Sequence, residues 1–416
     1  MLFKIIRYLF WAYLVISLFI YIFYIPPFEK PDENLHFLRA VSVSQGNFIC
    51  KTDKYNKIIN QIPISIYQYV GKNSKNINPG KSPFFVDKEN INQDMIQEVH
   101  SCVLPFFYYL ATGASMAMLR VWHFSPEIIF YSGRLINAVI VLLIVFLSLK
   151  GLPLTYQLIS LYVFSWPMVL YQISSYSKDA YFIALGLYLF NRFIFIIYHK
   201  KLNNLELILF IISLIFFILA RPPYIFFGIL LLVILKVRTN QNLRYFNKIL
   251  FLGTTLAVFL SLWFLLVNKV YITPFNTNHS LAYYAQINPQ LQFIYVLTHP
   301  INYLLTFLRS LASFSVFYLK SCIGIFGYLS QPLPNYVYIF FLLIGAVIIF
   351  VVRKDRKISF FNHLKNPLIA IIILTVGVLF SAMYLYSSPV GAPLIYGIQG
   401  RYLINLVPLI ILLLAF

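Results

Sequence analysis

The chain has 416 residues, of which 60% are hydrophobic and only 11% are charged, yet its formal net charge is +20. Soluble domains are typically about 45–50% apolar and about 25% charged, so this composition excludes a disordered chain and a soluble nucleic-acid-binding protein. Long uncharged runs place such a chain in a lipid bilayer, and only three Cys exclude a disulfide scaffold. We expect an all-α, polytopic membrane protein with no nucleic-acid partner.

The first apolar run, residues 5–25, is about as long as a bilayer crossing, and two basic residues, Lys4 and Arg7, lie at its start. The basic residues predict a cytoplasmic N-terminus, and the absence of a small-residue exit site predicts an uncleaved anchor. The same criteria predict about ten spans, at 5–25, 127–149, 153–173, 179–198, 204–220, 223–237, 249–268, 334–352, 367–386 and 402–416.

Two further apolar stretches, 103–122 and 300–322, contain basic residues and are predicted to be helices that lie at the membrane surface or are packed half-way into the membrane. With these two excluded, basic residues concentrate in the loops on one side of the membrane, which places both termini inside. Two large external segments follow, at about 26–126 and 269–333. The whole chain, 1–416, is then a single membrane domain with a large first external loop.

Within the first external segment, residues 51–92 are rich in Asn, Lys and Ser and are predicted to form a polar loop. Cys50 and Cys102 both lie in this segment, where an oxidising compartment would permit a disulfide. We hypothesise that these two pair, which leaves Cys322 as the third cysteine.

Acidic residues are a sharper clue to function than basic ones, because the chain has only 12 of them. Asp32 and Glu33 follow Pro31 just outside the first span, a pattern typical of the first turn of a helix, on which Asp32, His36 and Arg39 would share one face. A helix start with favourable acids explains this pattern, and so does a general base oriented by His36 or Arg39. Asp32 and His36 are also two ligands for a divalent metal, although no third ligand accompanies them.

Another isolated acid, Asp179, is predicted at the outer end of a span on the same side as Asp32. It suits either a helix start or a second functional acid. Several arginines depart from the positive-inside trend and need an anionic partner on that side: Arg134, Arg221, Arg309 and Arg401. Bidentate guanidinium contacts favour a phosphate ligand, while contact with ordinary lipid phosphates explains any single one of them.

Four motifs resemble those of a bacterial family of polytopic membrane proteins of unknown function. The first and last are the most specific: P-D-E-x-x-H-x-x-R-A-x-x-x-S-Q-G at 31–46 and Q-G-R-Y at 399–402. G-R-L-x-N at 133–137 and S-x-D-A at 177–180 lie between them. The resemblance covers nearly the whole chain, although Leu329 is followed by Ser330 where the family pattern has Leu-Asp.

That family is similar to the GT-C glycosyltransferases, and the resemblance implies a GT-C-like transferase of the bacterial cytoplasmic (inner) membrane, with its active site facing the outside or periplasm. The donor would be a polyprenyl-phosphate-linked sugar, and the acceptor a cell-surface glycan or glycolipid. Direct displacement would invert the anomeric carbon. Catalytic acids are expected at Asp32 and Asp179, with Glu33 as the alternative base.

The remaining expected site residues bind substrate. Arg221 and Arg401, with Arg309, would hold the departing polyprenyl phosphate and stabilise its developing charge. His36 and Arg39 would orient the base or the acceptor, and Arg134 belongs to the same group of outer-side cations. No cofactor is required by this scheme, and a divalent metal stays an open question.

Two other functions fit the same composition. A polysaccharide polymerase or ligase also handles lipid-linked sugars, and it would depend mainly on external Arg and His. A transporter or flippase of a lipid-linked intermediate would carry repeats and interrupted helices. The chain has no evident repeat, while the Pro-containing break at 220–224 keeps the transporter hypothesis open.

Overall fold

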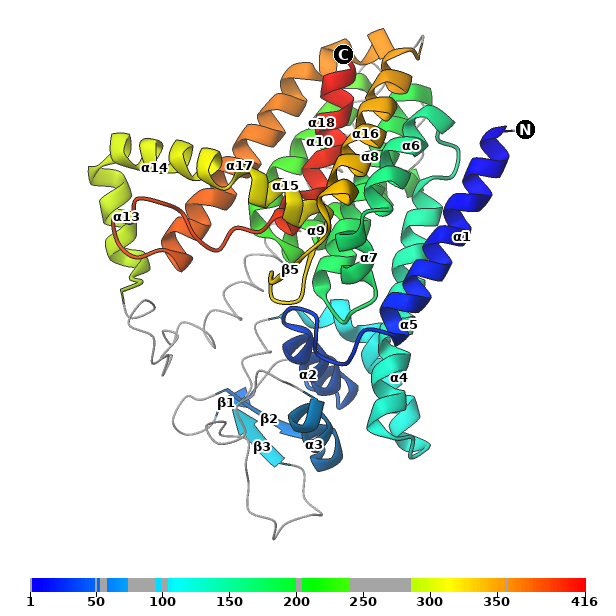
Figure 1. The fold of residues 1–416 in the computed structure, drawn as a ribbon, viewed down its shortest axis with the longest axis vertical. Helices are drawn as coiled ribbons and strands as arrows, with labels where there is room; N and C mark the ends of the chain where they lie inside the picture. Colours follow the sequence, from blue (N-terminus) through cyan, green and yellow to red (C-terminus); the bar gives the residue numbers. More distant parts are fainter. Residues whose placement is uncertain are drawn as a thin grey trace.

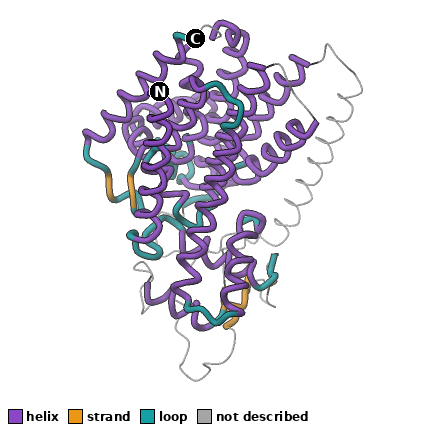
Figure 2. Tube along the Cα trace, turned by 90° about the vertical axis from the view of Figure 1, so that its right-hand side faces the viewer, coloured by secondary structure: helices purple, strands orange, loops and turns teal. Residues whose placement is uncertain are grey.

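The computed structural model describes most of the chain and is mainly helical, as the hydropathy predicted (Figure 2). The described residues are 2–48, 51–52, 58–73, 95–98, 104–199, 204–238, 286–355 and 358–416. They contain 16 α-helices, several 3-10 turns and two small sheets.

Most of the helices pack side by side in one bundle, and a smaller group gathers at one end of it (Figure 1). This end group consists of α2 (Glu33–Ser44), α3 (Ile64–Asn73) and α4 (Leu110–Val121), beside a three-stranded sheet. Both termini lie at the opposite end of the bundle (Figure 1). The longest bundle helices are α1 (Leu2–Phe23), α5 (Pro126–Ser148), α8 (Lys178–His199), α16 (Asn335–Arg353) and α17 (Lys365–Ser387).

Within the described ranges, four helices are long and apolar enough to cross a membrane: α5, α8, α16 and the segment Phe361–Ser387 that contains α17. All four coincide with predicted spans. A fifth is obtained if α13 (Pro289–Thr298) and α14 (Pro300–Ser313), which are bent by 108°, are counted as one broken span. The total of about ten stays a prediction, because 249–268 lies outside the described residues and the other predicted spans contain shorter apolar helices.

Prolines explain several of the shorter helices, because a proline lacks the backbone N–H and clashes with the preceding helical turn. The predicted span 153–173 divides into α6 (Leu154–Phe164) and α7 (Pro167–Ile173), which starts at Pro167. Between α9 (Asn204–Ala220) and α10 (Gly228–Arg238) the chain forms the 3-10 turn η3 (Pro222–Phe227). The predicted last span likewise begins as two short 3-10 turns, η5 (Gly400–Tyr402) and η6 (Ile404–Leu406), before α18 (Val407–Ala415).

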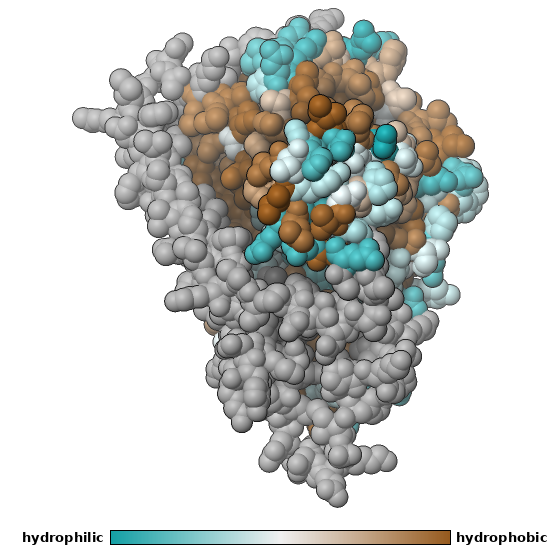
Figure 3. Space-filling model, turned by 90° about the vertical axis from the view of Figure 1, so that its left-hand side faces the viewer, coloured by the Kyte–Doolittle hydropathy of each residue, from teal (hydrophilic) through white to brown (hydrophobic). Residues whose placement is uncertain are grey.

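The two stretches predicted to lie on the membrane surface are each composed of more than one element. The first forms η2 (Phe106–Tyr109) and α4, and α4 packs against α2 and α5. The second divides at Phe314 into α14 and α15 (Ser315–Ile323). On α14 the exposed apolar side chains recur at helical spacing, at Ile301, Leu304, Leu305 and Leu308. Figure 3 shows the side of the molecule from which α13 and α14 project, with hydrophobic side chains over much of its described surface.

The end group contains regular structure that the sequence did not predict. Strands β1 (Lys51–Thr52), β2 (Ile58–Ile62) and β3 (Met95–Glu98) pair antiparallel in the order β1-β2-β3. The polar loop expected at 51–92 therefore includes two strands and α3. The Asn/Lys/Ser composition predicted a loop because the segments Ile58–Ile62 and Ile64–Asn73 are short. In the folded chain the first pairs with β1 and β3, and the second forms a helix.

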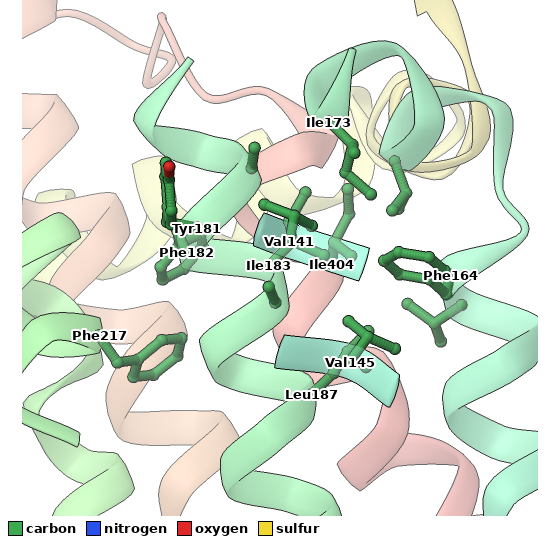
Figure 4. Packing of buried hydrophobic residues seen from close by; sticks show 14 of the residues in the cluster. Val141, Val145, Phe164, Ile173, Tyr181, Phe182, Ile183, Leu187, Phe217 and Ile404 are labelled. Atoms are coloured by element: carbon green, nitrogen blue, oxygen red, sulfur yellow. The ribbon is translucent and has the colours of Figure 1, made fainter. Parts of the chain in front are cut away.

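The bundle core is formed by aliphatic and aromatic side chains from many helices. Figure 4 shows Val141 and Val145 of α5 near Ile183 and Leu187 of α8, while Phe182 of α8 stacks on Phe217 of α9. These side chains are essentially buried. Because α8 is packed on nearly every side, its first turn is held at a constant position relative to the helices that surround it, and this turn carries Asp179.

Candidate functional site

Four charged residues that are far apart in the sequence meet at the end of the bundle that faces α2. Asp32 precedes α2, Asp179 lies in the first turn of α8, Arg221 precedes η3, and Arg401 lies in η5. Ion pairs join all four into one chain of alternating charge, which we call the acid–arginine cluster. The sequence predicted Asp32 and Asp179 on the same side, and the fold brings both acids to Arg401.

Asp179 is the centre of the cluster. Nη2 of Arg221 donates to both carboxylate oxygens of Asp179, each at 2.8 Å, and Nε of Arg401 lies 3.7 Å from Oδ2 of Asp179. The backbone N–H of Asp179 donates to the hydroxyl of Ser177, and the N-terminus of α8 adds a favourable dipole. Asp179 is therefore a buried anion that holds two guanidiniums together.

Asp32 differs from Asp179 in being open to solvent. It precedes α2 with φ 59°, in the left-handed region that Asp tolerates better than most residues, and its side chain makes no hydrogen bond to the helix start. The helix thus begins at Glu33, one residue later than the first turn predicted at Asp32. Oδ2 of Asp32 lies 3.5 Å from Nη2 of Arg401, and the side chain is 54% exposed.

Glu33, the neighbour of Asp32, points to the opposite side into a closed pair. Arg134 donates from Nε to Oε1 at 2.8 Å and from Nη2 to Oε2 at 2.6 Å, and both side chains are fully buried. The remaining guanidinium donors of Arg134 bind the carbonyls of Ile22, Ile25 and Pro26. Both residues were predicted site residues, and their contacts are those of a structural pair that ties α2 and α5 to the end of α1.

His36 and Arg39 do not share one functional face with Asp32. Nδ1 of His36 lies 2.5 Å from the hydroxyl of Tyr109, and the two rings stack. Burial lowers the pKa of His36 to about 3; the Asp179 carboxylate opposes this change, and Lys178, Arg401 and Arg221 reinforce it. His36 is therefore a neutral neighbour of the acid–arginine cluster.

Arg39 instead fastens the chain after α2. Its guanidinium donates to the carbonyls of Leu104, Asn47 and Phe48, and its side chain is buried. These carbonyls lie in the loop that follows α2 and in the segment before η2. Arg39 thereby positions the loop at the end of α2 opposite to Asp32 and does not face the cluster.

The other predicted site residue, Arg309, lies on α14 outside the acid–arginine cluster. Its side chain is exposed and makes no ion pair or hydrogen bond within the described ranges. The cysteine pairing proposed from the sequence involves Cys50 and Cys102, which lie outside the described residues. Cys322 is buried in α15, where its thiol donates to the carbonyl of Gly400.

Lys30, Tyr109 and Tyr402 contribute to the site, although the sequence analysis assigned them no role. Nζ of the buried Lys30 donates to the carbonyls of Tyr21 and Ser174 and to the hydroxyl of Ser174, which joins the loop before Asp32 to the loop before Asp179. Burial lowers the pKa of Lys30 well below its usual value, Arg134 lowers it further, and Glu33 opposes both. Tyr402 was visible in the Q-G-R-Y motif, whereas Tyr109 lies in a run of aromatic residues with no distinguishing signal.

The cluster favours an anionic ligand. Its two arginines balance its two acids, and the adjacent Lys178 adds one positive charge, while His36 is neutral near pH 7. Among the residues that the structure describes, no group of three or more His, Cys, Asp or Glu side chains is arranged to hold a metal ion.

Comparison with known proteins gives one match. Residues 15–410 match the model of the family described as predicted membrane protein, DUF2142. The chain belongs to this family. It is accordingly a multi-pass membrane protein that resides in a lipid bilayer, and the matched segment of this DUF2142 protein includes all four members of the acid–arginine cluster. No curated protein and no solved structure matches the chain.

Proposed function

We propose that this DUF2142 protein is an inverting, GT-C-type glycosyltransferase that transfers a sugar from a polyprenyl-phosphate donor to a cell-surface glycan or glycolipid. The proposal includes the ten-span topology, the cytoplasmic membrane and an outward-facing site. The observation that carries it is one exposed carboxylate, Asp32, in contact with Arg401, which shares the buried acid Asp179 with Arg221. A group-transfer site for a lipid phosphate needs this combination of a base and a phosphate clamp.

In the proposed reaction Asp32 accepts the proton of the acceptor hydroxyl, whose oxygen attacks the anomeric carbon of the donor sugar. The bond from that carbon to the phosphate oxygen breaks, and polyprenyl phosphate leaves with the electron pair. Arg221 and Arg401 neutralise the leaving phosphate, and Asp179 holds them in position. Attack opposite to the leaving group inverts the anomeric centre.

Exposure distinguishes the two acids that the sequence left as alternatives. The Asp32 side chain is 54% exposed and makes one long contact, whereas Glu33 is fully buried between donors. A general base must reach the proton that it removes, so the proposal uses Asp32 and assigns Glu33 to the scaffold. Arg309 is left out of the phosphate site because it lies outside the cluster.

The test is a transfer assay with purified protein and a panel of polyprenyl-phosphate sugars. Asp32→Asn should lower kcat by about 10²- to 10⁴-fold, the usual contribution of a general base, with an unchanged melting temperature. Glu127→Gln, at an exposed acid in the first turn of α5, is the matched control and should retain activity. Full activity in Asp32→Asn would contradict the assignment, and activity that survives loss of both Asp32 and Asp179 would favour a polymerase or ligase.

One observation favours the second candidate, a transporter or flippase of a lipid-linked intermediate. The α13–α14 pair is bent by 108°, and η3 interrupts the chain directly after Arg221, as interrupted helices do in transporters. Reconstituted vesicles would separate the two functions. Movement of a labelled polyprenyl-phosphate sugar across the bilayer, unaffected by Asp32→Asn, would support transport over transfer.

A further inference from the structure

The ring of Tyr402 lies against both arginines of the acid–arginine cluster. Cζ of Arg221 is 3.8 Å from the ring centroid, and Cζ of Arg401 is 5.5 Å from it. The backbone of Tyr402 is fixed independently, because the hydroxyl of Tyr224 in η3 donates to its carbonyl. The ring therefore stands at a defined place between the turn that carries Arg221 and the turn that carries Arg401.

Both guanidiniums keep unused hydrogen-bond donors. Within the described part of the chain, Nε of Arg221 and Nε of Arg401 are buried and have no hydrogen-bond partner. Arg401 as a whole is only 6% exposed. A guanidinium has five N–H donors, and buried donors without partners are costly, so two such arginines side by side indicate an anion that accepts from both.

We propose that Tyr402 is a positioning residue whose ring holds the guanidiniums of Arg221 and Arg401 at the spacing required to bind one phosphate group together. The two guanidiniums carry like charges and repel each other. The negative face of the aromatic ring, which both contact, offsets that repulsion and restricts their rotamers. Asp179 neutralises part of the charge of the two guanidiniums, and the ring of Tyr402 fixes their positions relative to each other. The identity of the phosphate, as that of a polyprenyl donor, rests on the proposed function.

The experiment measures binding of farnesyl phosphate to the purified full-length protein in a neutral detergent, with farnesol as the uncharged comparison. Tyr402→Leu should weaken farnesyl phosphate binding about five- to tenfold, which is the effect of losing a cation–π contact that is only partly shielded from water. Farnesol binding should not change, because the ring acts through the arginines. Tyr402→Phe keeps the ring and should bind farnesyl phosphate within about twofold of wild type.

The matched control is Phe195→Leu, which removes a ring 4.0 Å from Cζ of Arg192, an arginine that pairs with Glu206 instead of joining the cluster. It should leave farnesyl phosphate binding unchanged. Wild-type binding in Tyr402→Leu, or an equal loss in Tyr402→Phe, would overturn the positioning role. If Tyr402→Leu cannot be purified, Tyr402→Trp decides, since a larger ring should retain binding and a loss would overturn the role.

Failure of the proposed function has a different signature. If Arg401→Ala leaves farnesyl phosphate binding unchanged, the assignment of a phosphate site to Arg401 is contradicted, whatever the result for the Tyr402 variants. Competition by inorganic phosphate or by phosphatidylglycerol identifies the source of the phosphate. Displacement of farnesyl phosphate at equal concentration by either competitor would overturn the polyprenyl assignment, whereas weak competition by both supports it.

Discussion

Two acid–arginine groups lie next to each other in this protein, and they begin at adjacent residues. Glu33 enters a closed pair with Arg134, in which both side chains are fully buried and Arg134 also binds three backbone carbonyls. Asp32 enters an open cluster with Arg401, in which the carboxylate is half exposed and Nε of Arg401 has no hydrogen-bond partner within the described ranges.

The difference separates a structural ion pair from a binding site. Arg134 uses its donors on partners within the protein, so a ligand would have to break existing bonds to reach it. In the cluster, by contrast, Nε of Arg221 and Nε of Arg401 have no hydrogen-bond partner within the described residues, and Asp32 is half exposed. The adjacent Lys178 adds one positive charge to the balanced charges of the cluster. Both Asp32 and Glu33 pair with an arginine, so charge alone does not distinguish them. Only the group that contains Asp32 has hydrogen-bond donors without partners in the described residues, and this difference assigns the binding role to Asp32 and the structural role to Glu33.

The largest effect is expected from breaking the closed pair. Glu33→Gln should lower the free energy of unfolding by about 3–5 kcal/mol, because the Arg134 guanidinium would remain buried without its counter-charge. Asp32→Asn should change it by less than about 1 kcal/mol, since a half-exposed pair contributes little. Thermal unfolding and purification yield measure both, and equal losses would contradict the division into a closed and an open group.

The next effect concerns binding by the open cluster. Arg401→Gln should raise the Kd for farnesyl phosphate roughly ten- to a hundredfold, as expected for hydrogen bonds to a charged group worth about 1.5–3 kcal/mol. Arg309→Gln is the matched control, because this exposed arginine lies outside the cluster. A comparable loss in Arg309→Gln, measured by isothermal titration, would move the phosphate site towards α14.

A smaller effect follows from the neutral His36 beside the acid–arginine cluster. The unfolded chain protonates this side chain as the pH falls through about 6.5, whereas the folded protein resists protonation down to a pKa of about 3. Stability is therefore unaffected above about pH 6.5 and is lost progressively below it, by about 2 kcal/mol at pH 5. In His36→Asn this part of the slope should vanish in pH-dependent denaturant unfolding; parallel curves for the two proteins would contradict it.

The smallest change in stability is expected from the hydrogen bonds of Lys30, which join the loop before Asp32 to the loop before Asp179. Ser174→Ala removes one acceptor of Lys30 and should cost about 1 kcal/mol of stability. Ser315→Ala, at an exposed serine of α15, should stay within about 0.5 kcal/mol and serves as the comparison. Identical melting temperatures for the two variants would show that the carbonyls of Tyr21 and Ser174 suffice to hold Lys30.

Much of the site was predictable residue by residue. Motif positions marked Asp32, Asp179 and Arg401, and the departure from the positive-inside trend marked Arg221. The predicted sidedness put both acids on one side of the membrane. The role of each residue was not predictable, because it depends on partners far along the chain: Glu33 pairs with a residue 101 positions away, and Asp32 with one 369 positions away. The helical spacing of Asp32, His36 and Arg39 misled for the same reason, since α2 is packed on several sides.

The sequence by itself determined that this is a membrane protein, where α5, α8, α16 and α17 lie, and which rare charges deserve testing, because hydropathy and run length are local properties of the chain. Only the tertiary structure decided which of two adjacent acids faces outward and which arginines share it. A left-handed residue at Asp32 turns its carboxylate towards Arg401, while the next residue begins a helix and buries its own. That divergence over a single residue arises from backbone conformation and packing, which composition and spacing do not encode.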